Sequence, residues 1–164
     1  PRLAAAMARP TLDFNLSHCE GWALVGLSDG AAIGVDIELP RPVSDWAVLA
    51  AQHFAPAEQQ ALAALPADVR EDAFLAGWTR KEAFVKALGG GLAVALDSFE
   101  VTLDPYGPAR LASSSDPAHP AAAFSLWAGR PPWPMPGGWA AAAVRARATQ
   151  WRLYRCGPLH GRET

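Results

Sequence analysis

The segment Ile33–Glu38 reads IGVDIE, and its apolar residues alternate strictly with the others. A period of two predicts a β-strand, because successive side chains of a strand point to opposite faces. On this strand Ile33, Val35 and Ile37 share one face. Asp36 and Glu38 project side by side from the other face, and the rest of the fold is expected to form around this strand.

The two carboxylates of that strand suit a hard cation. Mg²⁺ takes oxygen ligands, commonly one or two carboxylates, and waters and substrate phosphates complete its octahedron. The alternative is an exposed sheet edge that carries ordinary acids, and taken alone the six residues favour that alternative. A choice between the two needs a second group of residues.

A long helix, from about Asp68 to Leu88, supplies that second group. Acids near its beginning and the glycines Gly89–Gly91 after its end agree with the helix dipole and with glycine C-caps. Its segment 78–86 reads WTRKEAFVK and places Glu82 and Lys86 on one face. This pair is either a surface salt bridge or, as its apolar flanks favour, part of a half-buried site with a metal ligand or general base.

The remaining patterns predict strands, then helices, then strands, which indicates an α+β domain. Two strands at 14–17 and 22–27 precede a third at 31–38, and Asp29-Gly30 predicts a hairpin between the second and third. Short helices are expected at 43–54 and 57–65, with Pro56 in the first turn of the second. Later strands are expected at 98–103, 122–128, 139–146 and 151–155.

Composition excludes several classes of protein. A chain of 164 residues with 51% hydrophobic residues suits one domain with a buried core, and a formal net charge of -2 argues against nucleic-acid binding. No apolar stretch approaches the roughly 20 residues that cross a bilayer. Cys19 and Cys156 form neither a metal-spaced pair nor a disulfide framework. We therefore expect a cytoplasmic protein that binds neither nucleic acid nor membrane.

Three smaller features keep two interpretations each. Ser17 and His18, at the end of the first strand, either donate hydrogen bonds to a phosphate or are ordinary turn residues. Gly89–Gly91 either caps the helix or lets backbone approach a ligand. Glu58 is expected to be an exposed residue in the first turn of its helix.

Four motifs occur in a fixed order along the chain. They are Phe14–His18 (FNLSH), Ile33–Glu38 (IGVDIE), Phe54–Glu58 (FAPAE), and Trp78–Lys86 (WTRKEAFVK) with Gly89–Gly91. In this order and spacing they resemble the surfactin-synthetase-type phosphopantetheinyl transferases, over about residues 1–101 and weakly through the last strands. The resemblance implies the α+β fold of that superfamily, an antiparallel sheet packed against a long helix. It makes residues 1–164 the catalytic C-terminal domain, roughly one and a bit halves of the family's pseudo-dimer.

The resemblance also implies a reaction. A phosphopantetheinyl transferase moves the phosphopantetheine arm of coenzyme A to a serine of an apo acyl or peptidyl carrier protein and releases adenosine 3′,5′-bisphosphate. By this resemblance Asp36, Glu38 and Glu82 bind Mg²⁺. Glu82 is the favoured base, and Asp36 and Lys86 complete the catalytic set. Fatty-acid, polyketide and nonribosomal-peptide carriers all remain open.

Coenzyme A itself is expected to meet four residues. The resemblance places Lys81 and Lys86 near its phosphates, Lys86 being the stronger match. It places Ser17 and His18 at the nucleotide end. Cys19 stands where the family often has serine, a small departure that leaves the pocket plausible.

The larger departure lies at the front of the chain. Family members of this type have an N-terminal half of comparable fold that supplies basic residues for the 3′-phosphate. In this chain the only basic residues before Phe14 are Arg2 and Arg9, and neither matches that family site. Either the chain is truncated or a second chain supplies that surface. A truncated, inactive homologue that acts as a binding module is therefore one alternative to the enzyme. Another Mg²⁺-dependent phosphoryl-transfer or hydrolase enzyme is the second.

Overall fold

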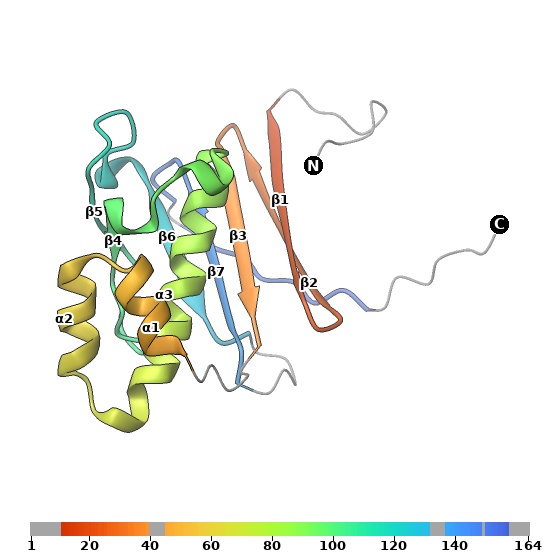
Figure 1. Ribbon diagram of the computed structural model, residues 1–164. Coiled ribbons are helices and arrows are strands. Elements are labelled where there is room, and N and C mark those ends of the chain that lie inside the picture. The colour runs from red at the N-terminus through yellow and green to blue at the C-terminus, as the bar shows by residue number, and fades with distance from the viewer. Residues whose placement is uncertain (1–10, 40–44, 132–136, 149, 158–164) are drawn as a thin grey trace.

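The structure is a computed structural model that describes residues 11–39, 45–131, 137–148 and 150–157. Its core is a sheet in the order β3-β7-β6, with α3 on one face and the β1-β2 hairpin packed on the opposite side (Figure 1). The strands are β1 (Leu12–Cys19), β2 (Trp22–Asp29), β3 (Ile33–Glu38), β4 (Phe99–Val101), β5 (Leu111–Ser114), β6 (Ser125–Gly129) and β7 (Trp139–Val144). The α-helices are α1 (Trp46–His53), α2 (Pro56–Ala64) and α3 (Ala67–Leu88).

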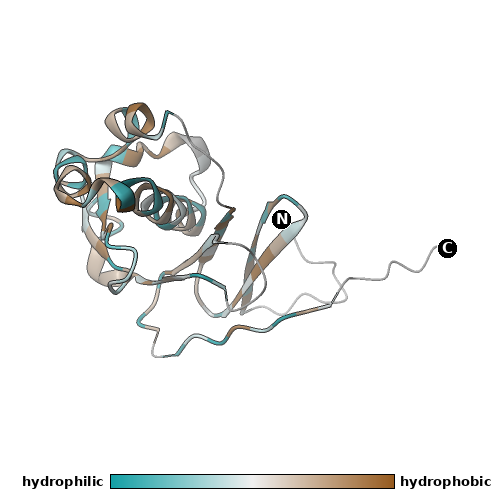
Figure 2. Ribbon diagram, turned by 90° about the horizontal axis from the view of Figure 1, so that it is seen from below, coloured by the Kyte–Doolittle hydropathy of each residue, from teal (hydrophilic) through white to brown (hydrophobic). Residues whose placement is uncertain are grey.

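The expected α+β class and the antiparallel sheet against a long helix are confirmed. Every strand pair in the described residues is antiparallel. Seen from below, α3 and the hairpin lie on opposite sides of the central sheet (Figure 2). No helix in the described ranges is long and apolar enough to span a membrane.

The middle strand β7 suits its position because it is small on both faces. Its sequence WAAAAV is buried throughout. Ala141 and Ala143 face the core with α3, while Ala140 and Ala142 face the hairpin side. Short side chains on both faces let the two outer layers approach closely.

Gly34 brings β3 into direct contact with α3. A Cβ at this position would lie 2.1 Å from the carbonyl oxygen of Ala83 and 2.2 Å from the amide nitrogen of Ala87. Only glycine permits this approach. The close approach places Asp36, two residues along β3, beside the turn of α3 that carries Glu82 and Lys86.

The predicted hairpin at Asp29-Gly30 is wrong. β2 pairs with β1, whereas β3 pairs with β7 in a different sheet. The hairpin turn is Glu20-Gly21, where both residues have positive φ (44° and 82°), as a two-residue type I′ turn requires. Gly30, with φ of 77°, instead redirects the chain from β2 into β3.

Side chains rather than a backbone ladder attach β1 to β3. Asn15 Oδ1 accepts a hydrogen bond of 3.2 Å from the Val35 N–H, which lies on the side of β3 away from β7. Cys19 Sγ, four residues along β1, lies 3.9 Å from Glu38 Oε2. Since alternate residues of β1 face β3, its polar side chains reach the acidic end of that strand.

Of the other secondary-structure predictions, some are confirmed and some are wrong. The long helix is confirmed, and Gly89 ends it with φ of 72°. α2 begins at Pro56, as expected. The strand expected at 151–155 is absent from the described residues, which are mostly exposed there. β5 was not predicted, and residues 43 and 44 of the first expected helix lie outside the described residues.

Candidate active site

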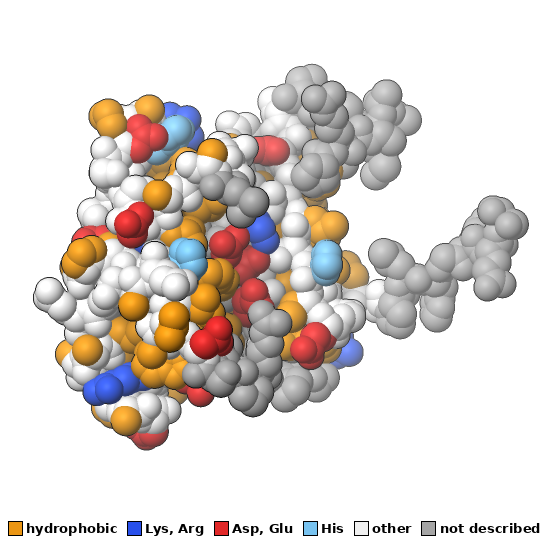
Figure 3. Space-filling model, viewed as in Figure 1, with side chains coloured by type: hydrophobic (Ala, Val, Ile, Leu, Met, Phe, Trp, Pro, Cys, Tyr) orange, Lys and Arg blue, Asp and Glu red, His pale blue; other side chains and the backbone are white. Residues whose placement is uncertain are grey.

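A pocket of about 360 Å³ opens where β1, β3 and α3 meet. In Figure 3 acidic side chains and a basic one gather in the seam between the helical part and the hairpin. The lining residues are Leu16, Ser17, His18, Asp36, Ile37, Glu38, Trp78, Glu82 and Lys86. The structure therefore brings together all the predicted site residues except Lys81.

Asp36 is the centre of the polar contacts in this pocket. Its side chain is only 6% exposed, and Oδ1 accepts hydrogen bonds from Ser17 Oγ (2.9 Å) and Lys86 Nζ (2.6 Å). Lys86 Nζ also donates to Ser17 Oγ at 3.1 Å. Oδ2 is buried and has no hydrogen-bond partner. A buried carboxylate oxygen without a donor is costly, so Asp36 is poised to accept a further ligand.

Glu82 lies one helical turn before Lys86 on the same face of α3. Burial raises the pKa of its carboxyl group, the negative charge of Asp36 raises it further, and Lys86 offsets part of the rise. Lys86 forms its ion pair with Asp36, so the helix-surface salt bridge between Glu82 and Lys86 is not the arrangement in the described chain. A carboxylate with a raised pKa is a better proton acceptor near neutral pH.

Trp78 is a pocket residue that the sequence reasoning did not assign. It precedes Glu82 by four residues, so its ring lies on the same stripe of α3, and His53 of α1 contacts it edge-on with ring centroids 5.7 Å apart. The four-residue spacing of positions 78, 82 and 86 places all three on one face of the helix, and this was the sequence signal that could have identified Trp78 as a pocket residue. Trp78 therefore contributes an apolar surface to the pocket that contains Asp36, Glu38 and Glu82.

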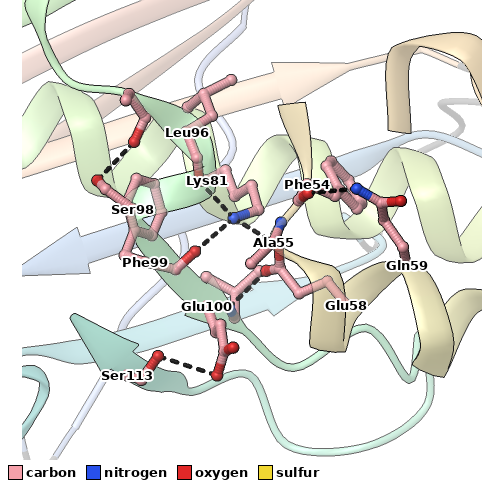
Figure 4. A network of polar contacts seen from close by, with 12 residues as sticks. Phe54, Ala55, Glu58, Gln59, Lys81, Leu96, Ser98, Phe99, Glu100 and Ser113 are labelled. Atoms are coloured by element: carbon pink, nitrogen blue, oxygen red, sulfur yellow. Dashed lines mark hydrogen bonds and ion pairs between the residues drawn. The ribbon is translucent and has the colours of Figure 1, made fainter. Parts of the chain in front are cut away.

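Lys81 does not reach the pocket, so the expected contact with coenzyme A phosphates does not fit the structure. Its side chain is fully buried, and Nζ lies 2.7 Å from Glu58 Oε2 (Figure 4). The prediction that Glu58 is exposed is also wrong, since it is 3% exposed. Burial lowers the pKa of Lys81 and raises that of Glu58, and attraction between the two charges offsets part of each shift. Helix position explains the difference: residues 81 and 86 lie on different sides of α3.

The acids of the pocket form a candidate metal site. Among the described residues no three His, Cys, Asp or Glu side chains stand close enough to hold a metal ion by themselves. Mg²⁺, however, commonly uses one or two carboxylates and takes its other ligands from water and phosphate. The partnerless Asp36 Oδ2, in a pocket that also contains Glu38 and Glu82, fits that requirement.

Fold and pocket together define the class: an α+β protein with an acidic, lysine-containing pocket between a long helix and an antiparallel sheet. Residues 32–144 match the family described as the 4′-phosphopantetheinyl transferase superfamily. The chain belongs to this superfamily, as the four motifs indicated.

Individual relatives agree with this assignment. The chain is 40% identical over 111 residues to 4′-phosphopantetheinyl transferase HetI of Nostoc sp., covering 68% of this chain and 46% of that protein. It is 38% identical over 98 residues to 4′-phosphopantetheinyl transferase Sfp of Bacillus subtilis, covering 60% and 42%. The chain thus spans less than half the length of these relatives.

A solved structure shows the same fold. The holo-[acyl-carrier-protein] synthase (AcpS) of Thermotoga maritima superposes with a TM-score of 0.52, over 72% of this chain and 65% of that one. The sequences are 20% identical, so the likeness concerns the fold.

Proposed function

We propose that this chain carries the catalytic half of a phosphopantetheinyl transferase, which moves the phosphopantetheine arm of coenzyme A to a serine of an apo carrier protein. The observation that carries the proposal is Asp36, which is buried with one free oxygen, bound to Ser17 and Lys86, and placed beside Glu38 and Glu82. Anionic phosphates need cations and hydrogen-bond donors, and this pocket offers both.

In the proposed reaction the serine hydroxyl oxygen of the carrier forms a bond to the β-phosphorus of coenzyme A. The bond from that phosphorus to the bridging oxygen of the pyrophosphate breaks, and adenosine 3′,5′-bisphosphate leaves with the electron pair. Glu82 accepts the hydroxyl proton, as a carboxylate beside the reacting groups can. Lys86 offsets negative charge on the phosphates, and Ser17 and His18 orient the nucleotide from β1.

Mg²⁺ is the proposed cofactor. Asp36, Glu38 and Glu82 would hold it, and when bound it would offset phosphate charge and orient the reacting groups. Lys86 Nζ, 2.6 Å from Asp36 Oδ1, already offsets charge on this carboxylate. Asp36 Oδ2 has no hydrogen-bond partner and would be available to the ion.

The alternative function is a binding module without transferase activity. The chain spans 46% and 42% of the length of two relatives, so transfer by this chain is a proposal that an assay must test. A hydrolase that uses the same acids is a further alternative. The transferase, the binding module and the hydrolase can be distinguished by the fate of coenzyme A.

The deciding experiment incubates the chain with Mg²⁺, coenzyme A and an apo acyl or apo peptidyl carrier protein. Mass spectrometry of the carrier should show the added arm, with Glu82→Gln as the inactive control. Coenzyme A binding without transfer to either carrier would indicate the binding module. Cleavage of coenzyme A without a carrier would indicate the hydrolase.

We propose further that the outer face of the hairpin pairs with another polypeptide, either an N-terminal half of the kind that the family has or a second chain. Leu16, Val25 and Leu27 are 46%, 56% and 62% exposed, and Leu16 lies opposite Val25 across the strands. Large side chains exposed together on one sheet face mark an interaction surface. Leu16 also lines the pocket, so a partner on this face would lie beside the site. Sedimentation of the chain, alone and with Val25→Glu and Leu27→Glu, tests for a second copy.

The cytoplasm is the proposed location. Cys19 and Cys156 are free thiols in the structure, and free thiols are typical of reducing compartments. Coenzyme A and apo carrier proteins would meet the enzyme there. Fractionation of cells that express the tagged protein is the corresponding measurement.

A further inference from the structure

A buried ionic cluster surrounds Lys81 of α3 (Figure 4), and neither Lys81 nor its partner Glu58 lines the pocket. Lys81 Nζ donates to the carbonyl oxygens of Leu96 (2.8 Å) and Phe99 (2.7 Å) and lies 2.7 Å from Glu58 Oε2. Three acceptors match the three N–H groups of an ammonium. The Nζ also sits 4.3 Å from the ring centroid of Phe99. Lys81 therefore has no donor left for a ligand.

Glu58 is equally saturated. Oε2 accepts a hydrogen bond of 2.8 Å from the Ala55 N–H at the start of α2, and Oε1 accepts one of 2.7 Å from the Val101 N–H of β4. With Lys81 these contacts join three elements, α2, α3 and β4, through two side chains. A buried network in which every group is satisfied holds its parts in one arrangement.

The cluster also fixes how α3 is turned about its axis. Successive residues of an α-helix are rotated by about 100°, so the side that Lys81 presents sets the side that Glu82 presents. Arg80 anchors the same region, since its guanidinium donates to the carbonyl oxygens of Thr102 and Asp104. Two fully buried cations thus immediately precede the pocket carboxylate.

We propose that Lys81 is a positioning residue: through its ion pair with Glu58 it holds the turn of α3 that presents Glu82 to the pocket, and it does not contact coenzyme A. The inference rests on the proposed function for its kinetic consequence. It separates two lysines of a single motif, one that binds the substrate and one that orients the helix.

The first test compares Lys81→Met with Lys86→Met in the full chain. Coenzyme A affinity is measured by titration calorimetry, and transfer kinetics are measured with saturating apo carrier. Lys81→Met should keep coenzyme A binding and KM within about twofold while kcat per folded molecule falls about 10- to 100-fold, because misplacement of a reacting group has effects of this size. Lys86→Met should weaken coenzyme A binding by about tenfold or more. Equal weakening of binding by both substitutions would overturn the proposal.

The second test covers a Lys81→Met variant that fails to fold. Loss of one partner leaves a buried charge unpaired, whereas loss of both does not, so Lys81→Met/Glu58→Gln should unfold at higher temperature than Lys81→Met alone. In this double variant, amides of residues 82–86 should exchange hydrogen at least about tenfold faster than in the unaltered chain, with β7 amides little changed. Uniform acceleration over α3 and β7, or none at 82–86, would overturn the positioning role. This readout needs no transfer activity, so it stands apart from failure of the unaltered chain to bind coenzyme A.

Discussion

Lys86 Nζ lies 2.6 Å from Asp36 Oδ1, and this contact joins the last turn of the long helix to the acidic end of β3. The lysine side chain is 30% exposed and the aspartate 6% exposed. The contact therefore spans a boundary between the core and an open pocket. A ligand that binds there meets a cation already held in place.

Lys86→Met should leave Asp36 as a buried charge without a cation. We expect a loss of about 1–2 kcal/mol in the free energy of unfolding, less than for a fully buried pair because Lys86 is partly solvated. Urea denaturation in EDTA measures this loss. Lys86→Met/Asp36→Asn should recover most of the stability but no transfer activity, and failure to recover stability would contradict the pairing.

Glu82→Gln should abolish transfer and stabilise the metal-free protein at neutral pH. The pKa of Glu82 is raised in the folded state, so the folded protein binds this proton more tightly than the unfolded chain does. Stability associated with this group is then present below the unfolded pKa and lost as pH rises through the folded pKa.

The melting temperature of Glu82→Gln in EDTA should therefore exceed that of the unaltered chain at pH 8, and the difference should vanish at about pH 4. Glu20→Gln, at an exposed turn, is the control for loss of one negative charge. A Glu82→Gln variant no more stable than the unaltered chain at pH 8 would contradict the burial of this charge.

Gly34→Ala should be strongly destabilising. Its new Cβ would meet backbone atoms of Ala83 and Ala87, which no side-chain rotation relieves, so we expect a loss of about 1–3 kcal/mol or more. Gly129→Ala is the matched control, because its Cβ would find an ordinary contact at 3.4 Å to Trp127. Chemical denaturation of both variants tests this difference, and equal stability would argue against the close packing of β3 on α3.

Ser17→Ala should weaken both the link from β1 to β3 and the catalytic step. Its hydroxyl donates to Asp36 and accepts from Lys86, so its loss should reduce the free energy of unfolding by about 1 kcal/mol. Ser115→Ala, at an exposed position, should change little. Thermal denaturation and the carrier assay follow the two effects, and a stability change equal to that of the control would remove Ser17 from the network.

Mg²⁺ added after EDTA treatment should raise the melting temperature of the chain. A ligand that binds only the folded state contributes about 2.7 kcal/mol at 100 times its dissociation constant. Asp36→Asn should remove this shift, whereas Asp116→Asn, outside the pocket, should keep it. An unchanged shift in Asp36→Asn would place the ion elsewhere.

Local sequence patterns predicted much of the secondary structure and several residues of the pocket. The alternation of Ile33–Glu38 predicted a strand with two carboxylates on one face, and both line the pocket. Acids at its start and a glycine at its end bounded the long helix within a residue of Ala67–Leu88. Periodicity and end preferences act over a few residues, so the sequence displays them directly.

Strand pairing and contacts between residues far apart in the sequence could not be predicted in the same way. The pairing of β3 with β7 joins segments about a hundred residues apart, and the mistaken hairpin at Asp29-Gly30 shows that a turn signal does not name the strand that pairs next. The sequence predicts a surface position for Glu58, because nothing near it in the sequence reveals that Lys81 and Val101 lie against it.

The two lysines of WTRKEAFVK show which properties the sequence determines and which depend on the tertiary structure. The sequence by itself determined that they lie on one helix five residues apart and that Glu82 shares a face with Lys86. Only the tertiary structure decided that Lys81 is enclosed by Glu58 and two carbonyl groups while Lys86 faces an open pocket with Asp36. Helical geometry fixes the angle between side chains, but the elements packed on each side determine which charge is buried and which is available to a ligand.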